Sequence, residues 1–86
     1  MLNVRVEHTD TFAGEANYSW VNRHEFEALD NASRRTLVRR AKQECGLTNV
    51  PCDVTEWGDD ITIQPRGLCQ IVFVTCETKE NASEQD

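Results

Sequence analysis

One segment of this 86-residue chain has helical periodicity, and the segments on both sides of it alternate as strands do. The apolar side chains that share one stripe at helical spacing are Leu37, Val38, Ala41 and Cys45. Possible N-caps precede this stripe at Asp30, Asn31 and Ser33, and Gly46 supplies the left-handed residue that commonly ends a helix. We therefore predict a helix of about four turns whose apolar stripe packs on a sheet.

Period-two alternation predicts the strands of that sheet. They are expected at Leu2–His8, from Tyr18 to about Arg23 or Phe26, and at Cys52–Thr55, Ile61–Ile63 and Leu68–Cys76. Thr9–Asn17 is expected to be a loop, while Trp57–Asp60 and Pro65–Gly67 are expected to be turns. The fold class is thus α+β, with one helix packed on a mainly antiparallel sheet in the order β-β-α-β-β-β.

The last strand is expected to be central, because Ile71–Val74 is apolar on both faces. It would be covered on both sides, or covered once and paired across a dimer interface. Residues 1–76 would form a single domain, and residues 77–86 an acidic, disordered C-terminal tail without apolar periodicity.

The composition, with 38% hydrophobic and 28% charged residues, is that of a globular domain. No apolar run approaches the roughly 20 residues of a membrane-spanning helix, and Met1–Val6 alternates from the start instead of forming a secretory signal. We expect a cytoplasmic protein without a membrane partner. In that compartment the four cysteines are expected to be free thiols that act as small buried hydrophobes.

No chemistry-bearing motif is recognisable. The cysteines, which lack the short spacing of a zinc knuckle, are Cys45, Cys52, Cys69 and Cys76. His8 and His24 lie in no nucleophile motif, and the four glycines are scattered singly instead of forming a phosphate loop. We expect no enzymatic activity, no catalytic or metal-ligating residues, and no cofactor.

Charge is the sequence's one functional clue. The net charge is −6, yet the helix carries Arg34, Arg35, Arg39, Arg40 and Lys42. The spacing i, i+4, i+7 puts Arg35, Arg39 and Lys42 on one flank, and Arg40 on the other side of the buried stripe. The ordinary interpretation is a solvated face whose charges pair with neighbouring carboxylates. The alternative is a basic nucleic-acid surface of Arg35, Arg39, Arg40 and Lys42, which the net charge disfavours.

A further hypothesis uses the acidic residues. Spaced carboxylates on a compact domain can occupy the basic groove of a nucleic-acid-binding protein, since they present a field like that of phosphates. A large aromatic residue in a turn is hard to bury and is a candidate interface anchor. The candidate partner-binding residues are therefore Trp57, Asp59, Asp60, Glu56 and Asp53.

Three segments, Gly14–Val21, Leu37–Lys42 and Pro65–Val74, resemble small uncharacterised proteins encoded by phages, prophages and plasmids. The resemblance spans most of residues 1–76 and implies an accessory protein that binds and redirects host machinery, as inhibitors of CRISPR and other defence complexes do. We expect a non-enzymatic protein of the host bacterial cytoplasm that binds a host or phage protein and inhibits a nucleic-acid-binding defence complex through its charged surface. The alternatives are a DNA- or RNA-binding protein that uses the basic helix 33–45, and a structural homo-oligomeric phage protein; the chain would be a monomer or a homodimer.

Overall fold

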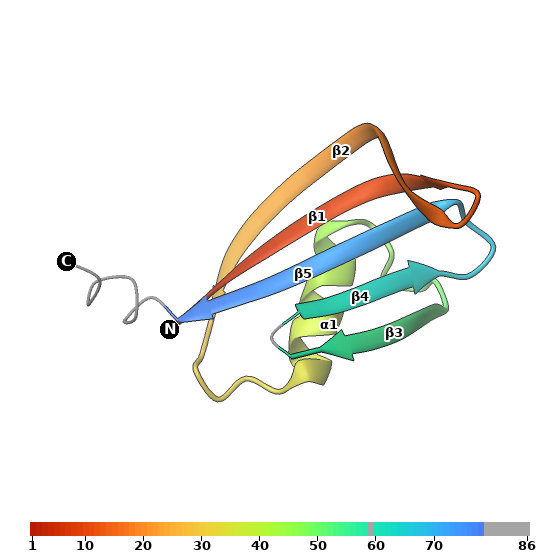
Figure 1. The fold of residues 1–86 in the computed structure, drawn as a ribbon. Coiled ribbons are helices and arrows are strands. Elements are labelled where there is room, and N and C mark those ends of the chain that lie inside the picture. The colour runs from red at the N-terminus through yellow and green to blue at the C-terminus, as the bar shows by residue number, and fades with distance from the viewer. Residues whose placement is uncertain (59, 79–86) are drawn as a thin grey trace.

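A five-stranded antiparallel sheet with one helix against it makes up the computed structural model, which describes residues 1–58 and 60–78 (Figure 1). The elements are β1 (Leu2–Phe12), β2 (Glu15–Ala28), α1 (Arg34–Glu44), β3 (Cys52–Trp57), β4 (Asp60–Pro65) and β5 (Gln70–Thr78). The strand order across the sheet is β2-β1-β5-β4-β3. The predicted α+β class and element order are confirmed.

The core lies between α1 and one face of the sheet. Alternate residues of the inner strands supply it, and α1 adds Leu37 and Ala41. The fully buried strand residues that face the helix are Val4, Val6, Ile61, Ile63, Val72 and Val74. Burial of these aliphatic side chains is the main stabilising contribution of the fold.

Helix α1 begins and ends at two of the signals read from the sequence. Ser33 is the N-cap, and its hydroxyl accepts a hydrogen bond from the Thr36 N–H at 3.2 Å. Gly46 has a φ of 72°, and Leu47 donates its N–H to the Lys42 carbonyl at 2.8 Å, so that the buried Leu47 folds back onto the last turn. The helix has 11 residues, about three turns and not four, because the capping residues stay outside it. It is too short and too polar to cross a bilayer.

Strand β5 is the middle strand, as its doubly apolar run predicts. It pairs with β1 along one edge, from Leu2↔Thr78 to Asp10↔Gln70, and with β4 along the other. β4 covers only Val72–Thr75 on its edge of β5, so the dimer predicted to form through the last strand stays a prediction. β5 also extends through Thr78, so residues 77 and 78 belong to the sheet and not to a tail; residues 79–86 of the predicted tail lie outside the described residues.

The prediction of a loop at Thr9–Asn17 is wrong. β1 continues to Phe12, Ala13 and Gly14 form the turn, and β2 starts at Glu15. Both turn residues have positive φ, 56° for Ala13 and 84° for Gly14, as a two-residue type I′ hairpin requires. Ala13 is not a residue that signals such a turn, which is why the hairpin was not expected from the sequence.

Candidate functional site

Trp57, the aromatic candidate of the sequence analysis, is exposed at the end of β3. Its side chain retains 69% of its accessible surface, and its backbone pairs with Asp60 across the β3–β4 hairpin. Asp59, also in the predicted set, lies outside the described residues. The turn thus presents an exposed tryptophan, and the question is whether the predicted carboxylates gather around it.

Strand alternation separates those carboxylates. Glu56 pairs with Ile61, a core residue, so Glu56 shares the helix-covered side of the sheet. Asp53 and Trp57 are odd-numbered residues of the same strand, so they lie on the opposite side of the sheet from Glu56. Asp60 pairs with Trp57 and so lies on that side too, which leaves Glu56 apart from the other described carboxylates of the predicted set.

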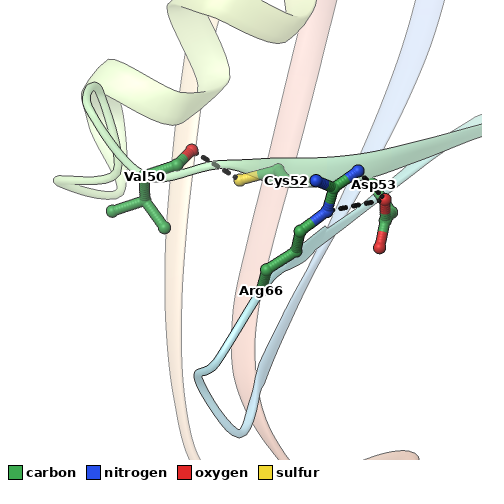
Figure 2. Close-up of polar contacts among 4 residues, drawn as sticks. All are labelled: Val50, Cys52, Asp53 and Arg66. Carbon is green, nitrogen blue, oxygen red and sulfur yellow. Dashed lines mark hydrogen bonds and ion pairs between the residues drawn. The ribbon is translucent and has the colours of Figure 1, made fainter.

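Asp53 is also neutralised locally by Arg66. Figure 2 shows the guanidinium lying over the carboxylate, with Arg66 Nη2 2.7 Å and Nε 3.1 Å from the same Oδ1 atom. Hydrogen bonding and charge from Arg66 hold the pKa of Asp53 below its usual range. Beside this pair the Cys52 thiol donates to the Val50 carbonyl at 3.2 Å (Figure 2).

Glu56 is neutralised from the helix. Arg34 Nε lies 3.7 Å from Glu56 Oε1, and Arg34 Nη2 donates to the Gly58 carbonyl at 2.7 Å. Arg34 thereby ties the first turn of α1 to the β3–β4 turn. Both pairs are exposed, so they contribute little stability, but each reduces the negative charge that a partner would meet.

The flank of α1 formed by Arg35, Arg39 and Lys42, here called the basic flank, is different. These side chains surround a shallow hollow of about 280 Å³ together with Val38 and Thr48. None of the three forms an ion pair with a carboxylate of residues 1–58 or 60–78. The other cations of that part of the chain are all paired, namely Arg5, Arg23, Arg34, Arg40 and Arg66.

Arg40, grouped with the basic flank in the nucleic-acid hypothesis, is held on the other side of α1. Its guanidinium lies 4.7 Å from the centre of the Phe26 ring, and its Nε is 3.4 Å from Glu44 Oε2. A cation that stacks on an aromatic ring and pairs with a carboxylate is less available to an outside ligand. The structure therefore brings together three of the four predicted basic residues.

The uncovered face of the sheet has a hollow of about 590 Å³ whose lining includes Arg5, Arg23 and Phe73. Its cations are already engaged. Arg5 lies 3.5 Å from Glu25 and 3.4 Å from Glu77, and Arg23 lies 3.2 Å from Glu7. The charged side chains of this face pair with one another, so the face does not present charge of a single sign to a partner.

A third hollow, of about 680 Å³, lies between β2 and α1 and was not expected from the sequence. Here called the β2–α1 hollow, it includes the apolar side chains of Met1, Phe26, Ala28 and Leu29. It borders β2, which is an edge strand of the sheet and the longest strand of the fold. Only recognition of the Ala13–Gly14 turn would have revealed from the sequence that β2 is so long.

The histidines have structural partners. His8 is buried, with Nε2 2.8 Å from Gln70 Oε1 and its ring against Trp20, while His24 Nδ1 is 3.9 Å from Glu44 Oε1. Burial raises the pKa of the Cys45 thiol to about 11, which disfavours the nucleophilic thiolate. All four cysteines are unbridged. Contrary to the expectation that they are buried, Cys69 lies in the loop before β5 and is exposed, while Cys45, Cys52 and Cys76 are half-buried. Among the described residues no group of three side chains is arranged to hold a metal ion.

Comparison with protein-family models, curated proteins and solved structures finds no match to this chain.

Proposed function

We propose that this chain is a non-enzymatic binding protein that docks through its basic flank on an acidic surface of a partner protein. The observation that carries the proposal is the charge pairing. Five described cations have carboxylate partners within the chain, whereas Arg35, Arg39 and Lys42 have none and lie around one hollow. Among residues 1–58 and 60–78, positive charge without a carboxylate partner is thereby confined to one flank of a chain whose net charge is −6.

The surface proposed to bind a partner is thus the basic flank and not the set of carboxylates around Trp57. The set around Trp57 supported the phosphate-mimic hypothesis, but Asp53 and Glu56 lie on opposite sides of the sheet and each pairs with an arginine. The role as a phage-type accessory protein at a cytoplasmic host defence complex stays a prediction. A basic flank is compatible with such a role where the target presents clustered carboxylates.

An acidic protein is a better partner for this flank than a nucleic acid. Each phosphate contact contributes a slope of about −0.9 to the dependence of log affinity on log salt, so that three contacts give only about −2.7 and weak binding. The net charge of −6 repels a polyanion at longer range. A folded acidic surface can place its carboxylates against the flank and direct its other groups elsewhere.

The test compares two variants of equal net charge. In the flank variant Arg35→Gln, Arg39→Gln and Lys42→Gln remove three positive charges. In the control, Thr55→Glu, Gln64→Glu and Leu68→Glu add three negative charges at exposed positions away from the flank. Circular dichroism should show that both variants fold.

Each tagged protein is used to capture partners from a nuclease-treated bacterial lysate, and captured proteins are identified by mass spectrometry. We expect wild type and control to retain the same acidic protein, and the flank variant to lose it. Raising the salt concentration should release that protein from wild type. Capture of no protein, or equal capture by all three, contradicts the proposal. A gel shift with a duplex or single-stranded oligonucleotide that the flank variant abolishes would establish the nucleic-acid alternative instead.

A further inference from the structure

Strand β2 lies at the edge of the sheet. Within residues 1–58 and 60–78 it neighbours only β1, and most of its residues are exposed. Natural proteins usually protect an edge by making it short, as the six residues of β3 do here, whereas β2 has 14 residues and no proline. A bulge opposite Thr9–Thr11, where Tyr18 has a φ of 57°, interrupts the first part of β2, so the regular edge from Val21 to Ala28 is the site for pairing with another strand.

The ladder fixes which backbone groups of β2 point outward. Thr11 donates its N–H to the Cys69 carbonyl at 2.9 Å, which continues the β1–β5 ladder. Because backbone groups alternate along a strand, even-numbered residues of β1, such as Val6, bond to β2, and their partner His24 bonds back. The odd-numbered residues from Val21 to Glu27 therefore direct their N–H and C=O groups away from the sheet.

The side chains along this edge complement a second copy of themselves. A two-fold axis normal to the sheet and passing through His24 pairs Arg23 of each chain with Glu25 of the other. Both residues direct their backbone groups outward, so each such pair exchanges two hydrogen bonds. With the axis at Arg23 or at Glu25, the register sets two like charges directly opposite each other, which is destabilising.

The same register brings Trp20 to the β2–α1 hollow. Trp20 lies on the helix-covered side of the sheet, where its ring meets His8 edge-on, and it is still 38% exposed. The axis at His24 places it opposite the partner's Ala28, which lines the hollow together with Phe26 and Leu29. The hollow combines apolar side chains with the guanidinium groups of Arg39 and Arg40, which can stack on an aromatic ring. An exposed indole and this hollow on one chain thus become complementary on two.

We propose that this protein forms a homodimer in which two β2 strands pair antiparallel about His24 into one continuous sheet, with Trp20 of each protomer in the β2–α1 hollow of the other. The proposal depends on the edge of β2 and on this hollow, which shares only Arg39 with the basic flank, so it can fail while the proposed function holds. Because the axis is normal to the sheet, both helices lie on the same side of the dimer.

Cross-linking tests the register. At the axis, the two copies of residue 24 form a non-hydrogen-bonded pair with Cα atoms about 4.5 Å apart, within the range of a disulfide. His24→Cys is therefore expected to give a covalent dimer under mild oxidation, with the linked peptide identified by mass spectrometry. Arg23→Cys is the control, because in this register residue 23 does not face its own copy. Equal cross-linking of both variants, or of neither, would overturn the proposed register.

A proline scan of one position tests edge pairing without relying on cysteine. Glu25→Pro removes an outward N–H that the β1 ladder does not use, while Glu25→Ala removes the same side chain and keeps the N–H. Light scattering coupled to size exclusion should show wild type and Glu25→Ala as dimers and Glu25→Pro as a folded monomer. A monomeric wild type at all concentrations, or a dimeric Glu25→Pro, would overturn the proposal.

Fluorescence tests where Trp20 goes. The chain has two tryptophans, so Trp57→Phe leaves Trp20 as the sole indole reporter. Dilution of this variant through the dimer–monomer transition should shift the emission to longer wavelength as the indole leaves the hollow. Leu29→Asp, which puts a charge in the hollow, should raise the dissociation constant at least tenfold. Emission that does not change on dissociation would contradict burial of Trp20 in the partner.

Discussion

The His8 and Trp20 rings meet edge to face, with centroids 5.0 Å apart and planes at 88°. His8 comes from β1 and Trp20 from β2, and the His8 Nε2 atom lies 2.8 Å from Gln70 Oε1 at the start of β5. This contact joins three strands at the end of the sheet. It gives a buried histidine an aromatic neighbour and a polar partner, so it needs no catalytic explanation.

Removing that histidine should be costly. We expect His8→Ala to lower the free energy of unfolding by about 2 kcal/mol, since it removes both a buried ring and a hydrogen bond. Asn22→Ala is the control, because Asn22 pairs with His8 across the ladder but is exposed. Urea denaturation followed by circular dichroism measures both, and similar losses in the two variants would contradict the structural role assigned to His8.

A substitution in the turn of the β1–β2 hairpin should raise the stability of the protein. Ala13 adopts a φ of 56°, which alanine tolerates poorly and asparagine tolerates well. Ala13→Asn is expected to stabilise the protein by about 0.5–1 kcal/mol, and Ala13→Val to destabilise it. Thermal unfolding of the two variants beside wild type checks the prediction, which requires their midpoints to move in opposite directions.

The cap of α1 can be assigned among three candidates. Asp30, Asn31 and Ser33 were equal by sequence, but the Thr36 N–H bonds to Ser33. Ser33→Ala should therefore cost about 1 kcal/mol, whereas Asn31→Ala should be close to neutral. Chemical denaturation that ranks Asn31→Ala as the more damaging change would show that the cap lies elsewhere.

Asp10 should make the stability depend on acid pH. Its carboxylate accepts hydrogen bonds from the Ser19 hydroxyl at 2.6 Å, the Asn17 amide at 3.0 Å and the Ser19 N–H at 2.9 Å. The Ser19 and Asn17 side chains lower the pKa of Asp10 from 3.8 to about 2. Because the folded pKa is the lower one, the stabilisation is present above about pH 4 and is lost as the pH falls toward 2.

Asp10→Asn should accordingly unfold at a lower temperature than wild type near pH 7. The difference between the two proteins should narrow between about pH 4 and pH 2, where wild-type Asp10 takes up its proton. Calorimetric melting points across this range check the prediction. A gap that stays constant with pH would mean that the carboxylate charge of Asp10 does not contribute to the stability of the fold.

The cysteines should differ in reactivity. With a pKa of about 11, only about one Cys45 side chain in a thousand is a thiolate at pH 8, whereas Cys69 is exposed in a loop. Alkylation by iodoacetamide, followed peptide by peptide, should label Cys69 well before Cys45. Labelling in the presence of urea is the control, since unfolding should make the two rates similar.

Much of the fold was predictable because its signals are local. The helix was predictable from Ser33 and Gly46, and the central position of β5 from the apolar run Ile71–Val74. The hairpin at Ala13–Gly14 was not predictable, since its turn type requires a positive φ at Ala13 and alanine is not a residue that indicates such a turn.

The candidate surfaces were harder to predict, because they depend on which charges meet across the sheet. The spacing of Arg35, Arg39 and Lys42 grouped them correctly on one flank, as the hollow they line shows. Their lack of carboxylate partners in the described residues could not be read from the sequence. Nor could the pairing of Asp53 with Arg66, since Asp53 lies in β3 and Arg66 in the turn after β4, and the two meet only through the β3–β4 register.

The central position of β5 has a consequence for how the protein is made. The strand that joins the β1–β2 hairpin to the β3–β4 hairpin is the last of the described strands to be synthesised, and Leu2 finds its partner only at Thr78. A ribosome must therefore release the chain through Thr78 before the sheet can close. Until then the β1–β2 and β3–β4 hairpins lack the strand that pairs with both of them. Nascent chains that stall before Gln70 should therefore be substrates for chaperones and proteases.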